Sequence, residues 1–120
     1  MQTAGGRNAT DTTQLLKGVL DLAVLAVVRN EDGYGYDIVR RLRVAGLDDV
    51  GDASVYGTLR RLYQAGALKS YVVASEEGPH RKYYGATPAG RDLYESWTKK
   101  WRGFAEAMDV LIDTPERKTA

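Results

Sequence analysis

The sequence has no cysteine and a single histidine, and each shortage excludes a class of site. Without cysteine the chain has no disulfide framework, no thiol nucleophile and no cysteine-ligated zinc site. With His80 alone, a metal site built from histidines of one chain is nearly excluded, so we expect no metal and no cofactor. The longest apolar stretch, LLKGVLDLAVLAVV, is too short to span a membrane. The first residues, MQTAGGRNAT, lack the pattern of a secretory signal, so we expect a cytoplasmic protein without a membrane partner.

Charge is nearly balanced over the whole chain but not along it. The 120 residues, 43% of them hydrophobic and 28% charged, suit one globular domain. The net charge of +1 gives no whole-protein field for nucleic acid, so any such binding depends on uneven placement of charge. The placement is uneven, because residues 78–91 carry Arg81, Lys82, Arg91 and His80 but no acid.

Apolar periodicity predicts three helices in the first half of the chain. Residues 1–10 are small and polar and are interpreted as a disordered tail. A capping-box variant, DTTQ, begins a first helix over residues 11–29, which has apolar side chains on most of its sides. After the turn-rich segment NEDGY, a second helix ends at Gly46. A third helix has Asp52 as its N-cap and ends before Gly66 in the left-handed conformation. Its apolar stripe is formed by Val55, Leu59 and Leu62.

The second half of the chain predicts a hairpin and a long helix. The runs LKSYVVAS and HRKYYGAT are β-forming and are separated by the turn EEGP, so residues 68–86 are expected to form a two-stranded hairpin. Thr87 and Pro88 are an N-cap and a first-turn proline, which open a helix that reaches about Ile112. Its large apolar residues follow the heptad spacing of a helix that packs along another helix. They are Trp97, Trp101, Phe104, Met108 and Leu111.

This order of elements predicts a mainly α fold with a small β-hairpin, which is a winged helix-turn-helix with a long C-terminal dimerisation helix. In such folds the second helix of the pair enters the DNA major groove, and the hairpin, or wing, lies over the adjacent sugar-phosphate backbone. The expected division is a disordered tail (1–10), a winged helix-turn-helix DNA-binding domain (11–86), the dimerisation helix (87–113) and a disordered tail (114–120).

Three segments carry a resemblance to a known family: GYGYDIVRRL at residues 33–42, SVYGTLRRLYQAGAL at 54–68 and RKYYGATPAGR at 81–91. The chain resembles the PadR family of bacterial transcriptional regulators over about residues 15–112, and its single final helix is similar to the compact subgroup. The family usually has Thr-Leu-Tyr-Pro at the recognition helix, whereas this chain has Gly57 in the place of the proline. Glycine costs roughly 1 kcal/mol of helix propensity relative to alanine.

The third helix offers side chains of the types that read DNA. Arg60 and Arg61 can pair with guanine edges or with phosphates, and the alternative is that they form a solvated helix face. Ser54, Thr58 and Gln64 can donate or accept hydrogen bonds at base edges.

The remaining DNA candidates are two tyrosines and the basic residues of the wing. Tyr56 either reaches a phosphate or packs in the core, and the resemblance implies the same two alternatives for Tyr36. Arg81 and Lys82 are consecutive extended residues, so they point to opposite faces, and both are close enough to the tip to reach phosphates. His80 is interpreted as a solvated wing residue, with a pH switch as the alternative. The candidate DNA-binding residues are Tyr36, Ser54, Tyr56, Gly57, Thr58, Arg60, Arg61, Gln64, Arg81 and Lys82.

A homodimer is expected, because two recognition helices roughly 34 Å apart double the contacts that one can make. The resemblance implies that the first and last helices of the two chains pack together, and also that a small planar or aromatic, drug-like effector stacks on a tryptophan near this interface and releases the DNA. Trp97 and Trp101 are the candidates for effector binding, with plain core packing as the alternative. The expected interface residues are Leu16, Leu20, Trp97, Trp101, Phe104, Met108 and Leu111.

The sequence therefore predicts a sequence-specific DNA-binding transcriptional regulator, a repressor that acts as a homodimer on double-stranded operator DNA. An enzyme is not expected, because His80 has no carboxylate partner other than Glu76 and Glu77 across the turn. No glycine-rich phosphate loop follows a strand either. The alternative is a winged-helix module for protein–protein association that does not bind DNA.

Overall fold

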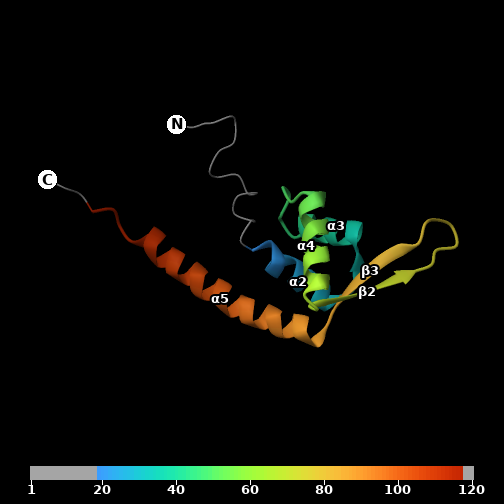
Figure 1. Cartoon of the computed structure of the whole chain (residues 1–120). Coiled ribbons are helices and arrows are strands. Elements are labelled where there is room, and N and C mark those ends of the chain that lie inside the picture. Colours follow the sequence, from blue (N-terminus) through green and yellow to red (C-terminus); the bar gives the residue numbers. More distant parts are fainter. Residues whose placement is uncertain (1–18, 118–120) are drawn as a thin grey trace.

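The computed structural model describes residues 19–117 and has a mainly helical fold with one small sheet (Figure 1). The helix expected over residues 11–29 is seen to begin at Leu20, with Val19 as its N-cap, while residues 11–18 and the tail at residues 1–10 lie outside the described residues. The elements are α2 (Leu20–Asn30), β1 (Gly33–Tyr34), α3 (Gly35–Val44), α4 (Asp52–Gln64), β2 (Leu68–Val73), β3 (Arg81–Ala86) and α5 (Pro88–Asp113).

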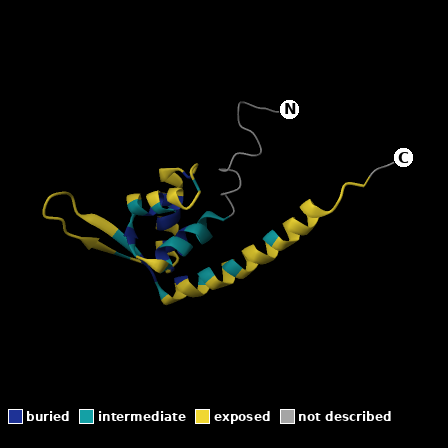
Figure 2. Ribbon diagram, turned by 180° about the vertical axis from the view of Figure 1, so that it is seen from behind, coloured by how far each residue is buried: buried dark blue, intermediate teal, exposed yellow. Residues whose placement is uncertain are grey.

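Three helices, α2, α3 and α4, meet in a single hydrophobic core, which is where the buried colours gather in Figure 2. Each helix contributes the residues of one face, as the 3.6-residue period requires. The expected stripe of α4 is confirmed, and α2 is buried or half-buried at every position up to Arg29. The core residues from these helices are Val24, Leu25, Val28, Ile38, Val39, Leu42, Val55, Leu59 and Leu62.

Glycines end the two helices of the helix-turn-helix. Gly46 and Gly66 have φ angles of 118° and 83°, which residues with a side chain rarely adopt. After α4, the Gly66 amide donates to the Tyr63 carbonyl at 3.0 Å and the Ala67 amide donates to the Leu62 carbonyl at 2.9 Å. This Schellman arrangement satisfies the carbonyls left open at the end of the helix. The expected left-handed Gly66 is thus confirmed.

The beginnings of α4 and α5 differ from each other in how they are capped. Asp52 was expected to be the N-cap of α4, but Gly51 occupies that position and Asp52 is the first helical residue. Its carboxylate instead accepts a hydrogen bond from Arg43 at 2.8 Å, so it is not available to cap the helix. The cap of α5 is as expected, because the Thr87 hydroxyl accepts a hydrogen bond from the Gly90 amide at 3.0 Å.

The sheet has three antiparallel strands in the order β1-β3-β2. The hairpin of β2 and β3 was expected, and its register pairs Leu68 with Ala86 and Val73 with Arg81. The third strand, β1, was not expected, because residues 30–34 were interpreted as a turn. It pairs Tyr34 with Tyr83 and so joins the helical core to the base of the hairpin. The tip of the hairpin projects away from the helices (Figure 1).

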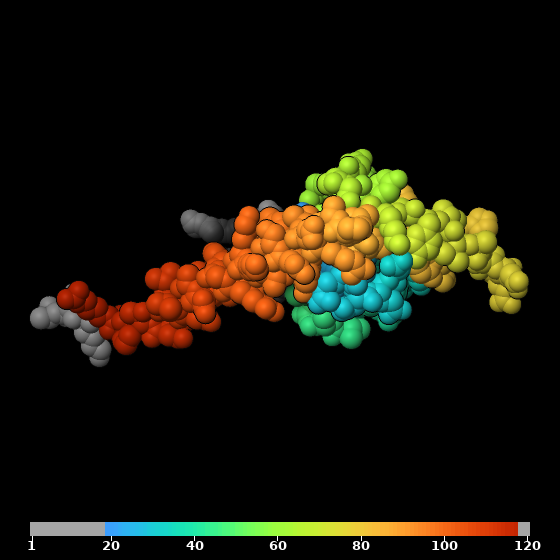
Figure 3. Space-filling view, turned by 90° about the horizontal axis from the view of Figure 1, so that it is seen from below, coloured from blue at the N-terminus to red at the C-terminus, as the bar shows by residue number. Residues whose placement is uncertain are grey.

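Helix α5 is packed at its start and extends beyond the domain at its end (Figures 2 and 3). A Cβ atom at Gly90 would overlap the carbonyl oxygen of Ala67, so only glycine allows this close approach. Leu93 and Tyr94 then pack against the core. No helix within the described residues is long and apolar enough to cross a membrane.

Candidate nucleic-acid interface

Helix α4 has a buried face and an outer face. Its outer face is formed by positions that recur every three or four residues, which places them along one side of the helix. Gly57 lies half-buried among them. The exposed members are Ala53, Tyr56, Arg60 and Gln64.

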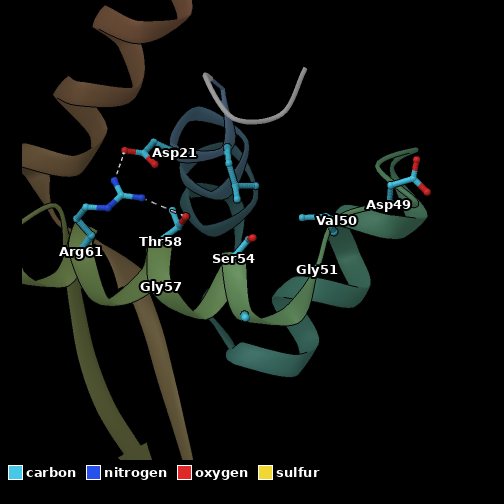
Figure 4. A pocket seen from close by; sticks show the side chains of 10 residues that line it. Asp21, Asp49, Val50, Gly51, Ser54, Gly57, Thr58 and Arg61 are labelled. Carbon is cyan, nitrogen blue, oxygen red and sulfur yellow. Dashed lines mark hydrogen bonds and ion pairs between the residues drawn. The ribbon is translucent and has the colours of Figure 1, made fainter. Parts of the chain in front are cut away.

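Two neighbouring arginines of α4 have different surroundings. Arg60 is exposed and makes no hydrogen bond or ion pair with any residue in the range 19–117. Arg61 turns toward α2, where one terminal nitrogen lies 2.8 Å from Asp21 Oδ2 (Figure 4). Its other terminal nitrogen donates to Thr58 Oγ1 at 3.3 Å. The hydrogen bond and the charge of Asp21 raise the pKa of the Arg61 guanidinium above its ordinary value.

The hydroxyl-bearing candidates of α4 are also placed differently from one another. Thr58 is only 3% exposed and lies in the buried face beside Leu59, so the expected base contact does not fit its position. Ser54 is exposed and lies near the start of the helix. It borders an open pocket of about 380 Å³ between α2, the loop before α4 and α4 itself (Figure 4). Arg61 and Asp21 border the same pocket.

The two candidate tyrosines both reach the surface. Tyr36, in the first turn of α3, is 56% exposed, so the alternative of core packing does not hold for it. Tyr56 is 40% exposed and is not a core residue, and its ring lies against the backbone of Gly35. The outer face of α4 and the first turn of α3 therefore adjoin at this ring.

The basic residues of the wing lie on opposite faces of β3, as the pleat predicts. The guanidinium of Arg81 lies 4.5 Å from the centre of the Tyr34 ring, on the side of the sheet away from α4. Lys82 Nζ lies 5.6 Å from the ring centre of Tyr63, which belongs to α4. Both residues are exposed, and so is His80 just before the strand. Lys82 thus lies beside helix α4.

Sequence reasoning missed an aromatic cluster on the other face of the sheet. The Tyr83 ring lies 5.5 Å from Tyr34 and 5.8 Å from Tyr71, measured between ring centres. The Tyr71 hydroxyl donates to Asp32 at 2.6 Å, and this bond raises the pKa of Tyr71. The register of β1 with β3 brings these rings together, and no local pattern indicates that pairing.

The apolar seam of α5 continues the face that packs on the core. Beside the core, the Arg29 guanidinium lies 4.3 Å from the centre of the Tyr94 ring, and this neighbouring cation lowers the Tyr94 pKa. Leu20 is half-buried against the core, while Leu16 lies outside the described residues. The Trp101 and Phe104 rings are 6.1 Å apart. Beyond Tyr94, the exposed seam consists of Trp97, Trp101, Phe104, Met108 and Leu111.

Comparison with known proteins identifies the family to which this arrangement belongs. The model of the transcriptional regulator PadR-like family matches residues 24–96, which is more than half of the chain and includes α4 and the wing. The chain belongs to the PadR-like family. The winged helix-turn-helix and the family resemblance expected from the sequence are therefore confirmed.

Solved structures of PadR-like regulators match along nearly their whole length. A PadR-like transcriptional regulator from Bacillus cereus is 30% identical, with a TM-score of 0.76, and the match covers 85% of this chain and 99% of that one. A PadR family transcriptional regulator from Eggerthella lenta is 28% identical, with a TM-score of 0.77 and coverage of 86% and 89%. An uncharacterized protein of Lysinibacillus sphaericus is 25% identical over 103 residues, covering 84% of this chain and 94% of its own. The family and its structural relatives are transcriptional regulators and not enzymes.

Proposed function

We propose that this PadR-like protein is a sequence-specific repressor that binds double-stranded operator DNA through the outer face of α4 and through the wing. The observation that carries the proposal is Arg60, an exposed arginine at the centre of that face with no partner among residues 19–117. Thr58 is buried and Arg61 is paired with Asp21, so neither is among the proposed contacts. The proposed DNA contacts are Tyr36, Ser54, Tyr56, Gly57, Arg60, Gln64, Arg81 and Lys82.

The chemistry of these side chains assigns some of them to the bases of the DNA and others to its phosphates. An arginine in the major groove pairs with the N7 and O6 atoms of guanine, and a glutamine pairs with adenine, so Arg60 and Gln64 are assigned to bases. Lys82 and Arg81 are assigned to phosphates, which fix the protein on the duplex without reading its sequence. We also propose a cytoplasmic location, as the sequence predicts.

The test is fluorescence anisotropy with the duplex upstream of the protein's own gene, compared with a shuffled duplex at two salt concentrations. The expected result is tight binding to the first duplex and a log–log salt slope of about −0.9 for each phosphate neutralised. Equal, weak binding to both duplexes would contradict this operator assignment. Absence of binding even at low salt would contradict DNA binding and favour the alternative, a winged-helix module for protein association.

A homodimer through α5 is part of the proposal. The support is the exposed seam on a helix of about 39 Å, because a second copy of the same helix offers a matching apolar surface. Sedimentation at micromolar concentration should give twice the 13.2 kDa of one chain. Met108→Glu should shift the protein to the monomer, whereas Val110→Glu, on the polar side of the same helix, should not. A wild-type monomer would refute this part of the proposal.

An effector site at Trp97 and Trp101 completes the proposal. Both indole rings are exposed along the α5 seam, so a small planar or aromatic compound has a surface on which to stack, although plain packing in the dimer would use the same rings. Planar dyes should quench the tryptophan fluorescence and release the operator duplex, and both effects should weaken in Trp97→Ala. If a broad panel of such compounds produces no quenching, the effector assignment is wrong.

A further inference from the structure

The recognition helix α4 is tied to α2 by one ion pair within the described residues, Arg61 with Asp21. The terminal nitrogens of Arg61 lie 2.8 Å from the Asp21 carboxylate and 3.3 Å from the Thr58 hydroxyl. Both terminal nitrogens therefore already have an acceptor. Its neighbour Arg60 has none within residues 19–117. The guanidinium of Arg60 is therefore available to DNA, whereas that of Arg61 is already paired.

The position of Arg61 is nonetheless suitable for DNA. The residue flanks the outer face of α4, and its side chain is 60% exposed. The side chain of Asp21 is 38% exposed, and the two residues meet at the rim of the open pocket between α2 and α4 (Figure 4). An exposed pair of this kind is held by a small free energy, so changing one partner alters its state without unfolding the protein.

A guanidinium that is paired with a carboxylate neutralises that carboxylate and not a phosphate. A phosphate that approached Arg61 would have to replace Asp21 and would also meet the negative charge that Asp21 leaves behind. The carboxylate of Asp21 therefore acts on DNA binding twice, once by occupying Arg61 and once by repelling the duplex.

We infer that Asp21 is a positioning residue that keeps Arg61 away from the DNA phosphates and thereby limits the affinity and the salt sensitivity of this regulator. The inference rests on the proposed DNA-binding function, since it concerns how one side chain of that interface is used. Because phosphate contacts carry no sequence information, the effect of Asp21 should be the same on specific and unrelated duplexes.

The experiment measures the Kd and the salt slope of four variants and the wild type on both the native and the shuffled duplex. Asp21→Asn keeps the shape of the side chain and removes its charge, and it should bind both duplexes about fivefold more tightly, the range expected for an exposed ion pair. The salt slope should become steeper by about 0.9, one additional phosphate. Arg61→Ala alone should leave the salt slope unchanged and should weaken binding only slightly, because it leaves the charge of Asp21 unpaired. The double variant Asp21→Asn with Arg61→Ala should lose the whole gain of Asp21→Asn.

The matched control is Asp49→Asn. Asp49 borders the same pocket and carries the same charge, but within residues 19–117 it forms no ion pair. Its substitution should strengthen binding slightly through long-range charge alone and should leave the salt slope unchanged. Thermal unfolding confirms that each variant is folded, and Asp21→Ser replaces Asp21→Asn if the latter is not.

Three outcomes would overturn the inference. If Asp21→Asn binds no more tightly than Asp49→Asn, the pair does not restrain Arg61. If Arg61→Ala alone already makes the salt slope shallower by about 0.9, Arg61 contacts a phosphate in the wild-type complex. If the wild type fails to bind any duplex, the proposed function itself is wrong and the inference falls with it. Normal wild-type binding separates the first two outcomes from this one.

Discussion

The two helices of the helix-turn-helix each carry arginines, but Arg41 and Arg43 of α3 hold the scaffold together, whereas those of α4 lie at its surface. Arg41 of α3 donates to the backbone carbonyls of Glu31 at 3.0 Å and Asp32 at 3.2 Å, and it pairs with Asp37 at 3.1 Å. In α4, Arg61 has a single carboxylate partner and Arg60 has no partner in the described residues. The number of basic residues in a helix therefore says little about DNA binding until their partners are known.

The scaffold role of α3 follows from the geometry of the guanidinium. Its planar array of donors can bond several carbonyl oxygens at once, which an ammonium group cannot do as well. Arg41 uses this array at the end of α2, where carbonyls have no partner within the helix. Arg43 does the same for the loop before α4, because it donates to the Val50 carbonyl at 3.0 Å and to Asp52 at 2.8 Å. Arg41 thus holds α3 to the end of α2, and Arg43 holds the loop that leads into α4.

The largest effect on stability is expected for Arg41→Ala. The Arg41 side chain is only 21% exposed, so its removal takes a donor from the carbonyls of Glu31 and Asp32 and from Asp37 Oδ2 in a partly buried place. The free energy of unfolding, measured with urea, should fall by about 2–3 kcal/mol. The control is Arg40→Ala, whose side chain is 58% exposed and pairs with the same Asp37. It should cost under about 0.5 kcal/mol. Equal losses would remove the distinction between scaffold and surface arginines.

The helices and the hairpin were predictable because their signals are local. The stripe of Val55, Leu59 and Leu62 repeats with the period of a helix, and Gly66 carries the left-handed turn that ends it. The strand β1 was not predictable in this way. It has two residues, Gly33–Tyr34, which are too few to show a period, and its partner β3 lies about fifty residues later in the chain.

In the candidate site, too, some features follow from the local sequence and others depend on the tertiary fold. The exposure of Arg60 follows from the helical period, and so does the burial of Thr58, which shares a face with Val55 and Leu62 but was assigned to DNA for its hydroxyl. The pairing of Arg61 was not visible in the sequence, because Asp21 precedes it by 40 residues. Local periodicity thus decides which face a residue occupies, and only the tertiary fold decides with which residue it pairs.

Arg60→Ala should weaken DNA binding and leave stability nearly unchanged, whereas Arg41→Ala should mainly lower stability. Loss of one arginine contact to a base edge should weaken binding of the native duplex about tenfold, or about 1.4 kcal/mol. The free energy of unfolding should stay within about 0.5 kcal/mol of the wild type, because the side chain is exposed. The same variant should affect the shuffled duplex much less. A similar loss on both duplexes would move Arg60 from base reading to phosphate contact.

Arg43→Ala should lower both stability and DNA binding, and it is therefore intermediate between Arg41→Ala and Arg60→Ala. Its bonds to the Val50 carbonyl and to Asp52 hold the loop that leads into α4, but the side chain is 42% exposed. We expect a loss of about 1 kcal/mol in the free energy of unfolding, since the bonds are few and partly solvated. Binding of the native duplex should weaken as well, because α4 is less firmly held. Unchanged DNA binding with reduced stability would show that the loop does not set the position of α4.

Gly57→Ala should give the smallest change, and this change should be a gain in stability. Gly57 lies in the middle of α4, and a Cβ atom there meets nothing within 4 Å. Alanine should therefore raise the free energy of unfolding by about 0.5–1 kcal/mol, the helix propensity that glycine forgoes. The new methyl group would project among the proposed DNA contacts, so affinity for the native duplex should fall while stability rises.

The matched control for Gly57→Ala is Gly103→Ala in α5, where a Cβ atom also meets nothing within 4 Å. Gly103 lies on the polar side of α5, away from both the seam and the outer face of α4. This variant should show a similar gain in urea unfolding and unchanged DNA binding. If Gly57→Ala behaves in the same way as Gly103→Ala, duplex DNA does not approach the centre of α4. The outer face of α4 would then be a solvated surface, and the contrast between α3 and α4 would concern stability alone.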